Sequence, residues 1–190
     1  GKMPGDREDK FANLKLAYAY MCGHPGKKLL FMGQEFGQWN EWSEKRALDW
    51  YLLEDDSHKE LKDFTKACLI LNKKYRCLYE TDYSPEGFRW INANDKDNSV
   101  FSFIRISPDK KRHLLFVFNF TPVERPNHRI GVPVKGKYKL VLGDDMKNQK
   151  KTLTSVRGEC DGYKESLLID LHRYGIAVYE FNGDVNAHKP

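Results

Sequence analysis

The chain has 190 residues, of which 40% are hydrophobic and 31% are charged, and its formal net charge is +5. This composition excludes an intrinsically disordered chain, because it holds enough apolar material for a folded core. The positive excess is spread over single lysines and Lys–Lys pairs, without a basic face or a nucleic-acid-binding motif, so we expect no nucleic-acid partner. No apolar run approaches the ~18 residues of a membrane helix, so we expect no membrane partner.

Four cysteines are present, and none forms a CxxC pair or lies at metal-ligand spacing from a histidine. Cys22 and Cys68 fall on apolar helix faces, where a reduced and buried thiol is the expected state. Free thiols are typical of a reducing compartment, so we expect a cytoplasmic protein. The N-terminus shows no basic-then-apolar stretch, so we expect no secretory signal.

The first part of the sequence, up to about residue 85, alternates between helical and extended patterns. A helix is predicted from Asp6 to Met21, since apolar residues recur at helical spacing on more than one side and Gly23 ends it. The continuous apolar run Leu29–Met32 predicts a strand covered on both faces. A second helix is predicted from Ser57, where Ser-His-Lys-Glu reads as a capping box.

The strand expected at 29–32 has no partner in this part of the sequence. A strand covered on both faces needs a neighbour on each side to satisfy its backbone. We therefore expect its neighbours in a part of the protein outside this chain. The alternative is that it pairs with the β-rich second half.

From Gly87 onward the sequence predicts short strands separated by turn residues such as Asp161-Gly162. Several short strands at this spacing are typical of an antiparallel sandwich. Trp90 alternates with its neighbours in the first of them and is expected in the core. The expected strands are Phe88–Asn92, Val100–Ile106, Leu114–Phe120, Arg129–Val132, Tyr138–Leu142, Ser166–Leu171 and Ile176–Phe181.

The densest group of aromatic and polar residues follows the predicted strand. Aromatic rings stack on sugar faces while carboxylates and amides bond hydroxyl groups, so this stretch is typical of a carbohydrate cleft. For any single residue the alternative is a structural role in which the rings pin a long loop. Glu35 is interpreted as a buttress that bonds backbone amides near the strand end. The candidate substrate-binding residues are Glu35, Gln38, Trp39, Trp42, Asp49 and Trp50.

The sequence lacks a complete catalytic set. Retaining glycosyl transfer needs two carboxyl groups ~5–5.5 Å apart, and Glu35 supplies one at most. Neither a Ser-His-Asp arrangement nor a Gly-rich phosphate loop is indicated. His24, His58 and His128 are interpreted as surface residues, because they neighbour turn-forming prolines or a helix start.

An ordered set of short motifs resembles the bacterial-type glycogen (1,4-α-glucan) branching enzymes of the α-amylase-like glycoside hydrolase superfamily. The motifs are KMPGD at 2–6, KFANL at 10–14, HPGKKLLFMGQEFGQ at 24–38, LDW at 48–50, PEGF at 85–88 and NFTPV at 119–123. The resemblance covers the chain up to about Phe181.

The resemblance implies an α+β chain by segment. Residues 1–85 would be the last helix–strand–helix part of a catalytic (β/α)₈ barrel, residues 86–182 a C-terminal all-β antiparallel sandwich, and residues 183–190 a flexible tail. The parent enzyme would cleave α-1,4-glucan chains and transfer them to a 6-hydroxyl in glycogen biosynthesis. The family's catalytic carboxylates lie upstream, so no residue is assigned as catalytic and the chain alone is expected to be inactive. The family needs no cofactor, and no metal-ligand spacing is present.

Two alternatives stay open at this point. One is another enzyme of the same superfamily, such as a trehalose-forming hydrolase, although GQEFGQ and NFTPV favour branching. The other is a free-standing, non-catalytic glucan-binding module. An α-glucan is the expected partner of the parent, and self-association is expected because a barrel remnant exposes apolar surface and strand edges.

Overall fold

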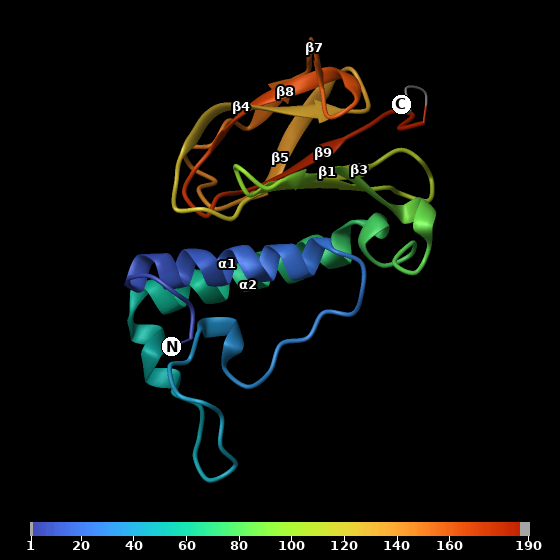
Figure 1. Cartoon of the computed structure of the whole chain (residues 1–190). Coiled ribbons are helices and arrows are strands. Elements are labelled where there is room, and N and C mark those ends of the chain that lie inside the picture. The colour runs from blue at the N-terminus through green and yellow to red at the C-terminus, as the bar shows by residue number, and fades with distance from the viewer. Residues whose placement is uncertain (1, 187–190) are drawn as a thin grey trace.

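The computed structural model describes residues 2–186, which form a pair of helices stacked on a β-sandwich (Figure 1). The helical part contains α1 (Arg7–Gly23), η1 (Gln34–Phe36), η2 (Trp50–Glu54), α2 (Asp56–Lys74), η3 (Arg76–Leu78) and η4 (Pro85–Gly87). The sandwich contains β1 (Phe88–Asp95), β2 (Val100–Arg105), β3 (His113–Asn119), β4 (Arg125–Val132), β5 (Lys137–Gly143), β6 (Thr152–Thr154), β7 (Val156–Cys160), β8 (Tyr163–Leu171) and β9 (Ile176–Phe181).

Helix α1 agrees with its prediction to within two residues at each end. The Asp6 carboxylate accepts a hydrogen bond from the Asp9 amide at 2.9 Å and caps the N-terminus. Two sides of the helix are buried, as expected. Leu16, Ala19 and Cys22 face one apolar cluster, while Phe11 and Tyr18 face another.

Helix α2 begins differently from its prediction. Asp55, and not Ser57, is the capping residue, because its carboxylate accepts a hydrogen bond from the Ser57 amide at 3.0 Å. Glu60 contacts Lys15 of α1 at 3.4 Å instead of folding back on its own helix. Aspartate caps as well as serine and stands two residues earlier, so it takes the position first. The helix buries one apolar stripe: Leu61, Cys68, Leu71 and Tyr75 are buried, and Phe64 is half-buried.

No strand forms at Leu29–Met32, so that prediction is wrong for this chain. The segment pairs with no other strand, and Leu29, Phe31 and Met32 are 76%, 49% and 47% exposed. The alternative of pairing with the second half is wrong too, since the strands there pair among themselves. A β-ladder needs a partner with free amides and carbonyls, and residues 2–186 present none to this segment.

The sandwich consists of two antiparallel sheets. One has six strands in the order β1-β2-β3-β9-β5-β6, and the other has three in the order β4-β8-β7. Their facing sides enclose a core that includes Leu115, Val117, Leu167 and Tyr179. The predicted antiparallel arrangement is confirmed. Strands β6 and β7 were missed, because the first is three residues long and the second is mainly exposed.

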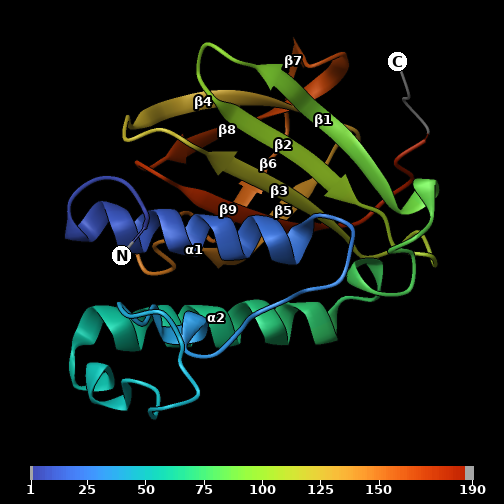
Figure 2. The ribbon, with the colours of Figure 1, turned by 60° about the horizontal axis from the view of Figure 1, so that its bottom comes forward.

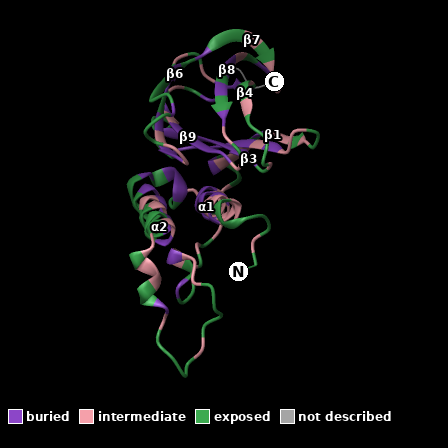
Figure 3. Cartoon of the chain, turned by 90° about the vertical axis from the view of Figure 1, so that its left-hand side faces the viewer, coloured by how far each residue is buried: buried purple, intermediate pink, exposed green. Residues whose placement is uncertain are grey.

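The two helices cover the outer face of the six-stranded sheet (Figure 2). Phe103, Phe116 and Phe118 of the sheet pack against residues of α1 and α2 in a second apolar cluster. A Cβ at Gly23 would lie 2.6 Å from the Phe116 ring, so only glycine permits the end of α1 to approach β3 this closely. Figure 3 shows buried residues between the layers and mainly exposed ones in the loop that extends from the helices.

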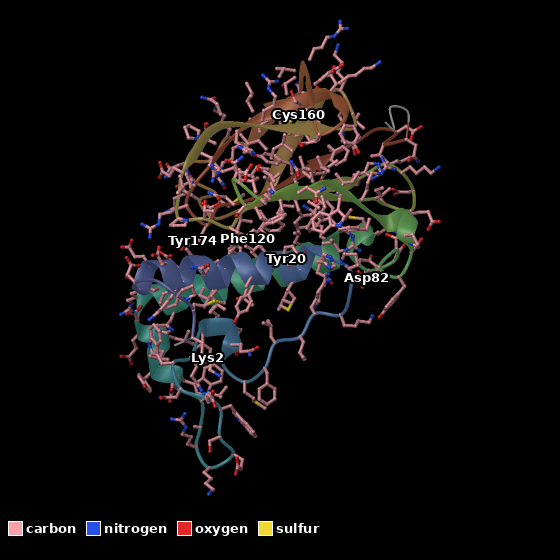
Figure 4. The ribbon with its side chains drawn as sticks, viewed as in Figure 1. Lys2, Tyr20, Asp82, Phe120, Cys160 and Tyr174 are labelled. Carbon is pink, nitrogen blue, oxygen red and sulfur yellow. The ribbon has the colours of Figure 1, made fainter. Side chains whose placement is uncertain are left out.

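A buried ion pair joins the two parts of the molecule. Arg105 of β2 is 0% exposed and donates to the Asp82 carboxylate at 3.0 Å and to the carbonyls of Gly23 and Gly87 at 2.7 and 3.3 Å. The other oxygen of Asp82, a residue labelled in Figure 4, accepts a hydrogen bond from the Gly26 amide nitrogen at 3.1 Å. One charged pair therefore connects β2, the end of α1 and the segment that leads into β1.

Three interpretations from the sequence need correction. Trp90 lies on the outer sheet face, part-exposed against Phe88 and Phe103, and not in the core. His58 is fully buried, because the helix turn carries it inward, where its Nδ1 donates to the Phe36 carbonyl at 2.7 Å. His24 is half-buried, with its ring stacked on that of Tyr20.

The expected flexible tail, residues 183–190, lies partly outside the described residues. Within the described part, Val185 is buried in the sandwich core and its carbonyl accepts a hydrogen bond from Arg89 at 2.8 Å. The Gly183 carbonyl contacts Nε2 of His113 at 3.0 Å. The contacts of the sandwich therefore continue as far as Asn186, whose side chain also binds Arg89.

Candidate functional site

The aromatic loop, residues 33–55, lies on the side of the helices away from the sandwich (Figure 1). It begins with Gly33 and Gly37, which flank η1 in left-handed conformation at φ 84° and 71°. Glycine adopts this conformation without steric cost, so the two positions allow the tight turn. Phe36 is fully buried between them. The hydroxyl of Tyr18 donates to the Gln34 carbonyl at 2.6 Å and fastens the turn to α1.

A hollow of about 630 Å³ opens between the aromatic loop and α1. Gln38, Trp39 and Trp42 line it from the loop, opposite Tyr18 of α1. Lys2, which is labelled in Figure 4, also lines it and forms an exposed ion pair with Glu41 at 2.6 Å. This volume lies in the range of small-molecule binding sites, and the lining combines aromatic rings with a few polar groups.

The two tryptophans of the hollow are partly held and partly free. Trp39 meets Phe11 and His58 edge-on, at centroid distances of 5.9 and 5.4 Å. Trp42 meets Phe31 edge-on at 5.4 Å. Both indole rings remain more than one-third exposed, at 38% and 42%. These rings pin the loop and still present apolar surface to the hollow, so the geometry accommodates both roles considered from the sequence.

Gln38 and Asp49 hold the loop in shape. The Gln38 side chain accepts from the Asp49 amide at 2.8 Å and donates to the Asn40 carbonyl at 3.0 Å. Asp49 is buried, and its carboxylate accepts from the Asn40 side chain at 3.0 Å. Asp49 is thus a frame residue and does not line the hollow.

Glu35 and Trp50 lie away from the hollow. Glu35 borders a separate depression of about 500 Å³ on α2, next to Lys59, Lys62 and Lys66. The buttress role expected for Glu35 falls instead to Gln34 and Gln38, whose side-chain oxygens accept backbone amides. The turn of η1 directs these neighbours to the backbone and Glu35 toward α2. Trp50 packs against Phe36 at 5.1 Å.

The structure therefore brings Gln38, Trp39 and Trp42 to one hollow and leaves Glu35, Asp49 and Trp50 elsewhere. Sequence reasoning missed Tyr18 and Lys2 as lining residues. Burial raises the pKa of Tyr18 to about 12, with a further contribution from the nearby charge of Glu35. In the sequence Tyr18 belongs to the apolar stripe of a helix, and that pattern gives no sign that its side chain also meets the aromatic loop.

The chemistry of the hollow is limited by its charges. Glu41 is the one carboxylate that lines it within residues 2–186, whereas retaining glycosyl transfer needs a pair. The same described residues contain no group of three or more His, Cys, Asp or Glu side chains placed to hold a metal ion. They also contain no helix long and apolar enough to cross a membrane.

Comparison of the sequence with known proteins identifies the family of this chain. Residues 90–182 match the model of the alpha amylase C-terminal all-beta domain. The chain is 46% identical to the 1,4-alpha-glucan branching enzyme GlgB of Butyrivibrio fibrisolvens, over 95% of this chain and 29% of that protein. It is 48% identical to GlgB of Aquifex aeolicus, over 77% of this chain and 23% of that protein. The chain belongs to the GlgB branching-enzyme family. It spans less than a third of the length of these GlgB relatives.

Solved structures agree on the fold beyond the GlgB sequences. Ttha1563 from Thermus thermophilus superposes with a TM-score of 0.62 at 17% identity, over 90% of this chain and 31% of that chain. The trehalulose synthase MutB from Pseudomonas mesoacidophila MX-45 superposes with a TM-score of 0.54 at 12% identity, over 89% of this chain and 38% of that chain. At such identities the likeness concerns the fold alone.

Proposed function

We propose that this chain is the C-terminal part of a glycogen branching enzyme that cleaves α-1,4-glucan chains and transfers them to 6-hydroxyl groups as α-1,6 branches. The observation that carries the proposal is its 46% identity to a GlgB relative over 95% of the chain. Residues 1–85 are the last part of the catalytic (β/α)₈ barrel, and residues 86–182 are the C-terminal sandwich domain. The catalytic carboxylates belong to the part of the enzyme that this chain lacks.

The surface of the helical part supports the barrel assignment. The apolar run Leu29–Met32 has no ladder partner within residues 2–186, although its composition suits a strand covered on both faces. Leu69 and Ile70 of α2 are also about half-exposed. Soluble domains rarely leave such apolar surface open, so it marks the side that the rest of the barrel covers.

The hollow of the aromatic loop is the part of this chain that meets glucan. Trp39 and Trp42 offer apolar ring surface, and Gln38 offers an amide whose orientation is fixed by the loop. Asp49 and Trp50 act indirectly, by holding the loop in position. Glu35 lies outside the hollow and makes no contact with the sugar bound there.

The test compares matched tryptophans in glycogen co-sedimentation. Trp42→Ala should weaken binding about two- to twelvefold, since a stacked ring contributes about 0.5–1.5 kcal/mol beyond burial. Trp90→Ala is the control, because Trp90 is similarly exposed but lies on the sandwich. Equal losses for both variants, or no glycogen binding at all, would overturn the role given to the hollow.

Activity is tested separately from binding, with iodine-stained amylose. The chain alone should show no branching, because one carboxylate in the hollow cannot serve as both nucleophile and acid/base. Binding without branching also fits a non-catalytic glucan-binding module. Addition of the missing barrel part of a GlgB relative separates the two, since only a barrel fragment restores branching. Branching by the repurified chain alone would contradict the proposal.

Self-association and a cytoplasmic location belong to the same proposal. Four free cysteines suit a reducing compartment. The open apolar side of the helices favours association of the isolated chain, which should appear in sedimentation velocity as a concentration-dependent increase in mass. Leu69→Ser should reduce it. A monomer at all concentrations would contradict this association.

A further inference from the structure

A small polar pocket, which we call the sandwich pocket, is built from residues of the β-sandwich alone. Its volume is about 140 Å³. Leu153 of β6 and Ile169 of β8 form its apolar walls, and polar side chains of the β5–β6 loop, β8 and β9 form the rest. Within residues 2–186 no part of the helices or the aromatic loop lines it. The pocket is therefore separate from the open apolar side of α2 that a barrel would cover.

Tyr179 of β9 brings a buried hydroxyl group to this pocket. Its side chain is 2% exposed and packs in the sandwich core, and the residue also lines the pocket. Among residues 2–186 its hydroxyl takes part in no hydrogen bond, although burial and the nearby charges of Asp170 and Asp144 raise the pKa of Tyr179 and keep it protonated. Buried phenols normally have a partner, so a ligand in the pocket would supply the missing one.

The loop that forms one side of the pocket is ordered without a ligand. The side-chain amide of Gln149 donates to the Asp144 carboxylate and to the Ile176 carbonyl, both at 3.0 Å. The Asp145 carboxylate accepts a hydrogen bond from the Asn148 amide at 3.1 Å. A wall that is already fixed loses little conformational freedom when a ligand binds, which favours affinity.

The charged side chains of the pocket lie in pairs of opposite sign. The Lys150 ammonium is 3.4 Å from the Asp170 carboxylate. The Nδ1 atom of His172 donates to the Asp144 carboxylate at 2.8 Å. Because neither sign is in excess, the pocket favours neither an anion nor a cation. Hydroxyl, amide and paired charged groups beside apolar walls suit a neutral ligand with several hydroxyl groups.

The volume of the pocket restricts that ligand to one ring. An apolar cavity of about 150 Å³ takes up a single six-membered ring. A chain of several sugar rings exceeds this space, so one unit enters and the next projects into solvent. The C–H face of the ring would then meet Leu153 and Ile169, and its hydroxyl groups would meet Tyr179 and Asp170.

We propose that the sandwich pocket binds one glucose unit of an α-glucan, as a second contact separate from the aromatic loop. The choice of glucose rests on the proposed function, which has an α-glucan as substrate, whereas the size, charge and lining of the pocket indicate a neutral six-membered ring. Two contacts on one chain raise the affinity for long glucans, because the second binds at high effective concentration.

The test titrates the chain with maltotriose and follows its backbone amide signals by NMR. The signals of residues 148–150 and 169–172 should shift along one saturation curve. Tyr179→Phe removes only the hydroxyl group and should weaken this binding about two- to twelvefold, as expected for the loss of one hydrogen bond. The variant should keep the urea midpoint of the unsubstituted chain, because its hydroxyl has no protein partner to lose.

Tyr138→Phe is the matched control. Tyr138 is 1% exposed in the same core but does not line the pocket, and its hydroxyl donates to the Val134 carbonyl at 2.7 Å. This variant should therefore lower the urea midpoint and leave the maltotriose affinity unchanged, which is the opposite pattern to Tyr179→Phe.

A fusion of this chain with the missing part of a GlgB relative tests whether the pocket stays open in the longer protein. Maltotriose should slow hydrogen exchange at residues 148–150 in the fusion as it does in the chain alone. Protection in the chain and none in the fusion would overturn the inference.

Three further results would also overturn it. One is a shift of the signals of residues 38–42 alone, which would leave the proposed function intact. Another is equal maltotriose affinity of Tyr179→Phe and the unsubstituted chain. The third is a larger shift of residues 148–150 with inorganic phosphate than with maltotriose, which would indicate an anion site. The absence of shifts in both regions would contradict the role proposed for the aromatic loop as well.

Discussion

The sandwich and the helical part of this molecule solve the problem of burial in different ways. The sandwich encloses its own core between two sheets, and its strands pair with one another. The helical part buries one side on the outer sheet face and leaves Leu29, Phe31 and Ile70 open on the other. A domain buries its apolar residues in a core of its own, as the sandwich does and the helical part does not. This difference is what the proposal of a barrel remnant explains, since the rest of a barrel would cover the open side of the helices.

Breaking the buried ion pair between Arg105 and Asp82 should have the largest effect on stability, because this pair joins the helical part to the sandwich. Asp82→Ala leaves the Arg105 guanidinium buried without its carboxylate, which should lower the free energy of unfolding by about 3–5 kcal/mol. Urea unfolding monitored by tryptophan fluorescence measures the loss. Arg76→Ala is the control, because the Arg76–Glu80 pair is exposed and its removal should leave the urea midpoint almost unchanged. If both substitutions lowered the free energy of unfolding equally, burial of the Arg105–Asp82 pair would not be the reason for its contribution to stability.

The close approach of α1 to the sheet gives a smaller effect. Gly23→Ala places a methyl group against the Phe116 ring and should destabilise the chain by about 1–3 kcal/mol. Phe116→Leu in the same chain should relieve part of that clash, so the double variant should be more stable than the sum of the single losses predicts. If the losses in free energy of unfolding for Gly23→Ala and Phe116→Leu simply add in the double variant, the predicted contact between the two residues is wrong.

The stability of the sandwich should depend on pH through His113 of β3. Burial lowers the pKa of His113, whose Nδ1 accepts from the Ser107 amide at 3.1 Å. The unfolded chain then binds the proton more readily than the folded chain, so stability is complete above the unfolded pKa of about 6.5 and falls as the pH decreases through the folded value. The urea midpoint should therefore drop between pH 8 and pH 5. His113→Asn should have a smaller drop, and an identical pH profile would contradict the assignment.

Local patterns in the sequence predict most of the sandwich and both helices. Alternation of apolar residues marks β8, because one of its faces is buried by the opposite sheet. Helical spacing marks α1 and α2 for the same reason. Strands β6 and β7 escape detection because they contribute little to either core.

Features that depend on distant partners could not be predicted in this way. The run Leu29–Met32 has the composition of a buried strand, but the described residues offer it no ladder partner and it forms no strand, which composition alone could not reveal. The Arg105–Asp82 pair joins residues 23 positions apart, and no periodicity links them. The burial of His58 follows from the aromatic loop folding over the start of α2.

The candidate site shows the same division. Composition identified the aromatic loop, and Gln38, Trp39 and Trp42 do meet at one hollow. Composition could not tell which way each side chain points from a loop of turns. Glu35 and Asp49 therefore looked equivalent to the others, although one faces α2 and the other is buried in the loop.

The most direct test of the account is hydrogen exchange on residues 29–32, measured in this chain and in a fusion with the part of the Butyrivibrio fibrisolvens GlgB relative that this chain lacks. If the helical part is a portion of a barrel, the amides of Leu29–Met32 should exchange rapidly in the chain alone and become strongly protected in the fusion. Those of β3 and β9 should remain protected in both. Unchanged rapid exchange at 29–32 in a folded fusion would contradict the proposal that these residues pair with barrel strands outside this chain.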